Sequence, residues 1–239
     1  MLLRLRNAAA SMAELSQRQD RVASNLANAN TTGYLRDRSF ATALRERIDA
    51  EGAPQSTRVA GQVADVTAGS LVETGNALDL AIEGNGFFAV QGDDGRTRYT
   101  RAGSFVLAAD GTVRSPQGHA LLRDDGARLT LPPSGGEIDV TSGGDVRVGG
   151  ALAGRIQTVE VLDPGQMVRL DGASFDAGGL AVQPGGGRVR QGFIAASNVD
   201  AVGEMVEMMS HVRLFESQQK ALTATDEALG AVTRDLGTF

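Results

Sequence analysis

The sequence predicts an α+β protein in which terminal α-helices form a coiled-coil-like core module and an antiparallel β domain is inserted between them. The first observation is that large apolar side chains recur every seven residues near both ends of the 239-residue chain. The second is that short apolar runs alternate with glycine-rich turns in the middle, which is typical of closely spaced antiparallel strands. A narrow apolar stripe does not give a helix a core of its own, so each end requires a partner helix.

Residues 3–29 are predicted to form one amphipathic helix, the main part of a core-module segment that we assign to residues 1–33. Two rows of its side chains have the spacing of the a and d positions of a coiled coil. Asparagine, threonine and glycine end this pattern at residues 28–33, as they do at helix termini. Residues 34–70 are predicted to be a linker or a partly ordered extension. The apolar members of the two rows are Leu5, Met12, Leu15, Val22 and Leu26.

Residues 71–193 are predicted to form the β domain. Runs such as residues 87–90 and 158–162 have the length and composition of strands, and dipeptides such as Asp110-Gly111 favour tight turns. The close spacing of these signals favours an antiparallel sandwich or a barrel-like sheet over a parallel sheet with crossover helices.

Residues 194–239 are predicted to contain the second long helix of the core module. Ser197 and Asn198 are residue types that cap helices, so the helix is predicted to begin after them. Gln19 in the first seam and Gln219 beside the second are polar, and polar residues in a seam can specify register and partner. The apolar members of the second seam are Met208, Val212, Phe215, Leu222, Leu229 and Leu236.

Composition narrows the range of functions. The formal net charge of −6 argues against a general nucleic-acid binder. The chain has no cysteine, so it has neither disulfides nor thiolate metal sites. No stretch approaches the roughly 20 apolar residues of a membrane span. Arg4 and Arg6 interrupt the apolar run that a cleaved signal peptide would need, so we expect no such peptide and no membrane insertion.

The sequence contains few candidate motifs for catalysis or for ligand and metal binding. Residues 84–89 fit the G-x-G-x-x-A dinucleotide fingerprint, but such a site needs a helix behind its glycines, and this stretch continues as a strand. We therefore predict a hairpin turn here and a turn or sheet-edge role for Asp79. The two histidines, His119 and His211, lack a second ligand at metal-binding spacing. We predict no catalytic residue, no cofactor and no metal site.

Three segments resemble the axial proteins of the bacterial flagellum, the rod and hook family. Residues 23–34 resemble the N-terminal signature of that family. Residues 74–90, followed by residues 99–105, resemble its central signature, and residues 197–216 its C-terminal one, whereas residues 120–190 match loosely. The positions that carry the resemblance are Asn25, Asn28, Thr32, Gly33, Thr74, Gly75, Leu78, Asp79, Gly84, Gly86, Phe87, Phe88, Tyr99, Thr100, Arg101, Gly103, Ser197, Asn198 and Val199.

The resemblance implies a structural subunit of the flagellar basal-body rod, not an enzyme. The short, compact middle favours a proximal-rod subunit, with a distal-rod subunit as the alternative. The implied partners are other rod subunits, both further copies and neighbouring axial proteins, and the flagellar type III export apparatus, with no nucleic acid. The implied location is the hollow rod that crosses the periplasm, reached by export without a cleaved signal peptide.

We expect the two seams to pack against each other within and between subunits, so that the chain ends become ordered on assembly. Three alternatives stay open. The helices could form a hairpin within a monomer. The chain could be a β-rich binding or adhesion module on a coiled-coil stalk. It could also be a nucleotide-dependent enzyme that uses the turn at residues 84–86, which predicts a thermal shift with NAD or ATP.

Overall fold

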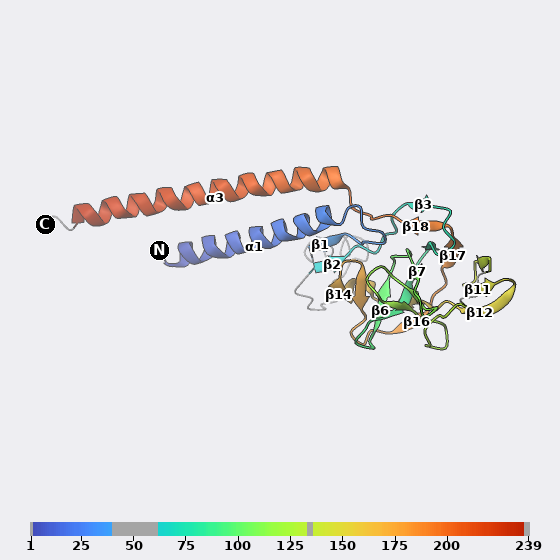
Figure 1. The fold of residues 1–239 in the computed structure, drawn as a ribbon. Coiled ribbons are helices and arrows are strands. Elements are labelled where there is room, and N and C mark those ends of the chain that lie inside the picture. The colour runs from blue at the N-terminus through green and yellow to red at the C-terminus, as the bar shows by residue number, and fades with distance from the viewer. Residues whose placement is uncertain (1, 40–61, 133–135, 237–239) are drawn as a thin grey trace, which may run out of the picture. The chain divides into compact units, whose positions relative to one another are not determined.

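The computed structural model describes residues 2–39, 62–132 and 136–236. The chain divides into two compact units, Met1–Ala27 with Asp200–Phe239 and Asn28–Val199, which we call the helical unit and the β unit. The predicted α+β class is confirmed (Figure 1). In the described part of the chain, no helix combines the length and the apolarity that a membrane span needs.

The described part of the helical unit consists of α1 (Leu2–Ala27) and α3 (Ala201–Leu236). The helices lie side by side and run in opposite directions (Figure 1). Asp200 caps α3, because its Oδ1 accepts a hydrogen bond from the Val202 N–H at 3.2 Å. The prediction that Ser197 or Asn198 provides the cap is therefore wrong. Coiled-coil packing of the pair stays a prediction.

The β unit consists mainly of short strands, and every strand pair in its described part is antiparallel. Two of the strands, β1 and β2, lie in the stretch predicted to be a linker. The elements are β1 (Asp37–Ser39), β2 (Gln62–Ala64), β3 (Leu71–Glu73), β4 (Leu80–Glu83), β5 (Phe87–Gln91), β6 (Thr97–Thr100), β7 (Val106–Leu107), β8 (Val113–Arg114), β9 (Ala120–Leu121), β10 (Ile138–Val140), β11 (Asp145–Val148), β12 (Ala151–Arg155), β13 (Thr158–Val161), the 3₁₀ helix η1 (Pro164–Gln166), β14 (Val168–Asp171), β15 (Ser174–Asp176), β16 (Val182–Pro184), β17 (Arg188–Gln191) and β18 (Phe193–Ala195).

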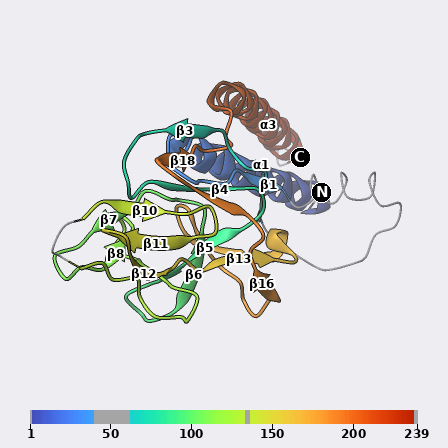
Figure 2. The same ribbon diagram turned by 90° about the vertical axis from the view of Figure 1, so that its right-hand side faces the viewer.

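The largest sheet has the strand order β14-β15-β6-β5-β9-β8-β7, and β13 joins it by pairing with both β5 and β16. A separate sheet has the order β10-β11-β12. The pairs β1–β2, β17–β4 and β18–β3 complete the unit, and the last two join strands that are far apart in the sequence. Figure 2 shows β5 and β13 in the middle of the unit, with β10, β11 and β12 to one side.

Strand β5 separates two apolar clusters. Neighbouring residues of a strand point to opposite faces, so Phe88 enters one cluster and Phe87 the other. Phe88 meets Phe105 edge-on with ring centroids 5.6 Å apart, and Phe87 meets Phe175 at 6.3 Å. The first cluster also receives side chains from β4, β8, β9, β10, β11 and β17. The β unit therefore has a core on both faces of its central strand.

Candidate assembly site and the junction of the sequence motifs

Two polar contacts join α1 to α3. Asn25 Nδ2 donates a hydrogen bond to Glu204 Oε1 at 3.4 Å, and Gln218 Nε2 donates to Ser11 Oγ at 3.2 Å. The two pairs agree with a single antiparallel alignment of α1 and α3, because a step back along α1 from Asn25 to Ser11 matches an equal step forward along α3 from Glu204 to Gln218. Asn25 and Glu204 are each only 1% exposed, so a shift of register would separate two buried polar groups. These contacts therefore favour the observed register over its neighbours.

The predicted seam residues occupy the less exposed side of each helix wherever their side chains are described. Leu15 and Val22 are buried, at 6% and 1% exposure. The side chains that are partly buried are Met12, Leu26, Met208, Val212 and Phe215. The side chains that fall outside the described residues are those of Leu5, Leu222, Leu229 and Leu236. A role for these residues between subunits stays a prediction.

A polar row on α3 was missed by the sequence analysis. Glu204, His211 and Gln218 recur every seven residues and lie on the less exposed side of the helix. Along the helix, members of this polar row alternate with members of the apolar row that starts at Met208. Successive members of the combined set are four and three residues apart, which is the spacing of a coiled-coil seam. Gln219, the predicted polar neighbour of the seam, is exposed, and it is Gln218 that bonds to α1. The signal for this row in the sequence is the seven-residue spacing of its polar side chains.

A second apolar surface lies on the first turns of α3, and we call it the outer stripe. Its members, Val202, Met205, Val206 and Met209, are 68%, 42%, 63% and 59% exposed. Their spacing of three, one and three residues places them on one side of an α-helix. A seven-residue row does not reveal the stripe, because its members are spaced by three, one and three residues.

The three segments that carry the family resemblance meet in the β unit. Gly33 has φ +67°, and its N–H donates to the carbonyl oxygen of Ala195 at 2.8 Å. A Cβ at Gly33 would overlap the backbone of Ala102, and a Cβ at Gly69 would overlap the carbonyl oxygen of Ala196. Glycine is required at both positions because backbone lies directly against backbone.

The Asn198 carboxamide joins three backbone segments of the β unit. Its Nδ2 donates to the carbonyl oxygens of Asp65 and Thr67, each at 2.9 Å. Its Oδ1 accepts a hydrogen bond from the N–H of Arg36 at 2.6 Å, and its own N–H donates to the Tyr34 carbonyl oxygen at 3.4 Å. Asn198 therefore ties the segment that follows α1 to the segment that precedes α3.

Arg169 on β14 holds the end of the first motif. Its guanidinium lies 4.4 Å from the ring centroid of Tyr34 and 4.7 Å from that of Phe175. Its Nη2 donates to Asp37 Oδ1 at 2.9 Å and to the Leu35 carbonyl oxygen at 2.5 Å. A planar guanidinium can stack and donate in its plane at the same time, which lysine cannot do. Local sequence patterns could not identify Arg169, which is 132 residues from Asp37.

Arg101 accounts for the glycine-rich turn at residues 84–86. Its Nε donates to the Gly86 carbonyl oxygen at 3.1 Å and its Nη2 to that of Gly84 at 3.3 Å, while its guanidinium lies 5.3 Å from the ring centroid of Phe87. Burial lowers the pKa of the Arg101 guanidinium. The turn joins β4 to β5, which pair with different strands, so the predicted turn is confirmed but the predicted hairpin is wrong.

The predicted turn or sheet-edge role of Asp79 is confirmed. The residue forms an isolated antiparallel bridge with Ser104, and its Oδ2 accepts a hydrogen bond from Thr74 Oγ1 at 2.7 Å. Its carbonyl oxygen accepts from the Gly192 N–H at 2.8 Å. Asn25 is the motif residue found in α1. The other motif residues in strands, turns or loops of the β unit are Asn28, Thr32, Gly75, Leu78, Phe88, Tyr99, Thr100, Gly103, Ser197 and Val199.

The two histidines lie in different units. His119 Nε2 is 3.3 Å from Arg98 Nη1 and 3.7 Å from Asp171 Oδ2, and His211 Nε2 on α3 is 3.9 Å from Glu207 Oε1. Within the residues that the structure describes, no group of three or more His, Asp or Glu side chains could hold a metal ion. Both histidines thus have structural partners.

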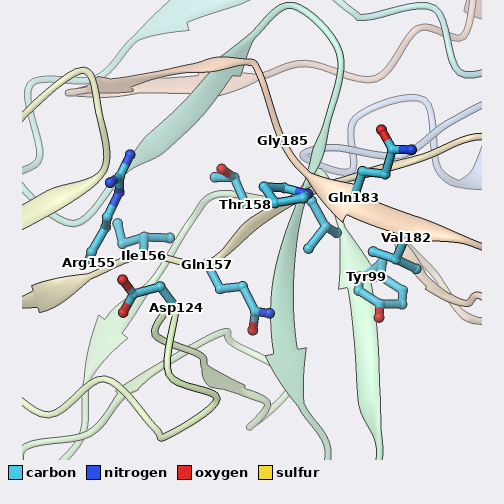
Figure 3. Close-up of a pocket in the computed structure, with 11 residues that line it drawn as sticks. Tyr99, Asp124, Arg155, Ile156, Gln157, Thr158, Val182, Gln183 and Gly185 are labelled. Atoms are coloured by element: carbon cyan, nitrogen blue, oxygen red, sulfur yellow. The ribbon is translucent and has the colours of Figure 1, made fainter.

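A cavity of about 520 Å³ lies beside β13 and β16 (Figure 3). Its polar lining includes Asp124, Arg155, Gln157 and Gln183, with Tyr99 at one side. Figure 3 shows these side chains pointing in different directions. Small-molecule sites usually combine apolar walls with a few convergent polar groups, so this lining does not indicate a ligand.

Comparison with known proteins gives the same result for all three regions. Family models match residues 5–34 ("Flagella basal body rod protein"), residues 81–148 ("Flagellar hook protein FlgE/F/G D1 domain") and residues 190–235 ("Flagellar basal body rod FlgEFG protein C-terminal"). The chain is 31% identical to the flagellar basal-body rod protein FlgG of Agrobacterium fabrum, over 90% of this chain and 92% of that protein.

Relatives of the FlgF type match equally well. The chain is 33% identical to the flagellar basal-body rod protein FlgF of Caulobacter vibrioides, over 93% of each chain. It is also 33% identical to FlgF of Escherichia coli, over 87% of this chain and 88% of that protein. The chain therefore belongs to the flagellar basal-body rod proteins of the FlgF/FlgG type, a family of structural rod subunits and not of enzymes.

Proposed function

We propose that this chain enters the rod through its helical unit, with the outer stripe of α3 packed against a neighbouring axial subunit. The observation that carries the proposal is the division of α3 into two apolar sides. One side, with Met208 and Phe215, is partly buried. The other side, the outer stripe, is exposed in the single chain. Exposed contiguous apolar surface of this kind marks interaction sites in soluble proteins.

Burial of the stripe would contribute favourable free energy to a contact with a neighbouring subunit. Full burial of a valine- or methionine-sized side chain contributes about 1.5–3 kcal/mol, and roughly half of that is available from each of the four stripe side chains, which are 42–68% exposed. Part of that gain is offset by the ordering of side chains and by the loss of translational freedom. A contact between different surfaces of successive subunits does not close on itself and so generates a helical assembly. A rod requires such an open helical assembly of subunits.

In this proposal the two seams form a coiled-coil-like helix pair, which the antiparallel contacts of Asn25 and Gln218 with the facing helix support. The partners are further copies and other axial subunits, and the assembled rod crosses the periplasm and transmits torque. We further propose export by the flagellar type III apparatus without a cleaved signal peptide. The proximal part of the rod is the proposed position, on the basis of the short middle of the chain.

The test is a double variant, Val206→Glu with Met209→Glu, expressed in a strain that lacks the gene. Both residues are exposed, so the free protein should keep its circular dichroism and its unfolding midpoint. We expect loss of motility and absence of the variant from purified basal bodies.

The matched control is Ser210→Glu with Ser217→Glu. It makes the same change in charge at exposed polar positions of the same helix, and it should enter the rod. Normal incorporation of the Val206/Met209 variant would contradict the proposed interface.

A further inference from the structure

We propose that Asn198 is a mechanical clamp that holds together the two places where the chain passes between the helical unit and the β unit. The chain passes between the units twice, at residues 27–28 and 199–200. The two connections are the covalent path by which a force applied to the helical unit reaches the β unit. Asn198 lies immediately beside the second of them.

The hydrogen bonds of Asn198 join the second connection to Tyr34 and Arg36, in the segment that follows the first connection. The segment after α1 is held where the Arg36 N–H donates to Asn198 Oδ1 at 2.6 Å and the Tyr34 carbonyl oxygen accepts from the Asn198 N–H at 3.4 Å. Separation of the two connections would break both contacts. A force that pulls the two connections apart therefore acts on these hydrogen bonds.

The same carboxamide also anchors the connections to a third segment. Asn198 Nδ2 donates to the carbonyl oxygens of Asp65 and Thr67, both at 2.9 Å. Asp65 follows β2 directly, and the Asp65 N–H donates to the Arg36 carbonyl oxygen at 2.7 Å. One side chain therefore uses its donor group and its acceptor to hold three stretches of backbone. Alanine at this position would leave the carbonyl oxygens and the N–H without these partners.

A second carboxamide in the β unit provides a matched control. Gln191 Nε2 donates to the carbonyl oxygens of Ala77 and Ile138, at 3.0 and 2.7 Å, and its Oε1 accepts a hydrogen bond from the Val140 N–H at 3.0 Å. Like Asn198, it is a carboxamide that donates to two backbone carbonyl oxygens and accepts from one backbone N–H. It does not bond to either connection, so it should affect general stability but not the clamp.

The experiment is single-molecule unfolding at constant force with handles attached to cysteines. The natural chain has no cysteine, so each introduced pair defines the pulling points uniquely. Handles at Asp20→Cys and Arg213→Cys, both exposed on the helices, load the two connections. Handles at Asp93→Cys and Gln117→Cys, both exposed in the β unit, load the sheet without passing through Asn198.

With the helical handles, Asn198→Ala should rupture the β unit about tenfold to a hundredfold faster than the natural chain, because the side-chain hydrogen bonds to Arg36, Asp65 and Thr67 are lost. Asn198→Asp keeps an acceptor for Arg36 but turns a carboxylate oxygen towards two carbonyl groups, so it should rupture at least as fast. With the internal handles, neither variant should change the rupture rate by more than about twofold. Gln191→Ala should leave the first rupture through the helical handles unchanged.

Equal acceleration by Asn198→Ala and Gln191→Ala through the helical handles would show a general loss of stability and overturn the proposal. No acceleration by Asn198→Ala would do the same. Only the source of the force in the cell depends on the proposed function, because it is the assembled rod that would load the helical unit. The measurement is made on the isolated chain, so a failure of the outer stripe to mediate rod incorporation would not change its outcome.

Discussion

The β unit and the helical unit are stabilised in different ways. In the β unit, apolar clusters lie on both faces of β5, and Phe88 is completely buried. In the described part of the helices, the buried apolar side chains are Leu15 and Val22, accompanied by the buried polar Asn25 and Glu204. A unit with a core on both sides of its central strand can fold alone. A helix pair with a narrow, partly polar contact and an exposed apolar stripe gains stability when a partner binds.

The difference in stability between the two units can be tested because different spectroscopic signals report on each of them. The chain has two tyrosines and no tryptophan. Both tyrosines, Tyr34 and Tyr99, belong to the β unit. Tyrosine fluorescence therefore follows the β unit, while far-ultraviolet circular dichroism follows mainly the helices.

The largest effect is expected for Gly103→Ala. A Cβ at this position would overlap the carbonyl oxygen of Leu80, and the Leu80 N–H donates to the Gly103 carbonyl oxygen at 2.8 Å. Two backbones in direct contact cannot both move aside, so we expect a loss of about 4 kcal/mol or more, measured by urea unfolding with tyrosine fluorescence. Gly172→Ala is the control, because a Cβ there meets open space. Equal stability of the two variants would contradict this explanation.

Phe88→Ala should lower the free energy of unfolding of the β unit by about 3–5 kcal/mol, because it removes a buried ring from the larger cluster. The tyrosine transition should move to lower urea concentration. Leu107→Ala, at a side chain that is 42% exposed, should change the same transition by no more than about 0.5 kcal/mol. A small effect of Phe88→Ala would mean that this cluster does not determine the stability of the β unit.

Val22→Ala tests the helical unit. Val22 is 1% exposed on α1, so its truncation should destabilise the helix pair by about 1–3 kcal/mol. The change should be visible in the circular dichroism transition and absent from the tyrosine transition. Gln17→Lys, on an exposed position of the same helix, serves as the control. A tyrosine transition that shifts with Val22→Ala would show that the units unfold together.

The smallest predicted effect concerns pH. The Thr112 backbone N–H, the Thr112 hydroxyl and the Arg114 guanidinium lower the pKa of Asp110 from 3.8 to about 2. A lowered folded-state pKa means that the ionised group stabilises the fold above pH 3.8 and that this contribution is lost as the pH falls towards 2. The urea midpoints of the natural chain and Asp110→Asn should therefore converge over that interval. A constant difference in midpoint across it would contradict the assignment.

The order of elements could be predicted from the sequence because local patterns encode it. Seven-residue apolar rows indicated the two helices, and short runs between turn residues indicated antiparallel strands. The cap of α3 was misplaced because Ser197 and Asn198 are also capping residue types, and only the structure shows that Asp200 accepts the hydrogen bond from Val202. Local propensity identifies candidates for a cap but does not choose among neighbours.

The contacts at the motif junction could not be predicted because they are long-range. Asn198 bonds to Arg36, 162 residues away, and Arg169 bonds to Asp37, 132 residues away. A single sequence contains no periodic signal for such pairs. The resemblance to axial proteins marked Asn198 as important but gave it no physical role. The hydrogen bonds supply that role, since one carboxamide holds three segments together.

The most direct test of the difference between the units is urea unfolding of the isolated natural chain, followed simultaneously by circular dichroism and tyrosine fluorescence. If the β unit has a complete core and the helical unit depends on a neighbour, the circular dichroism signal is lost at clearly lower urea concentration than the tyrosine signal. Coincident transitions would show one cooperative unit that is already complete in the single chain, and would contradict the account.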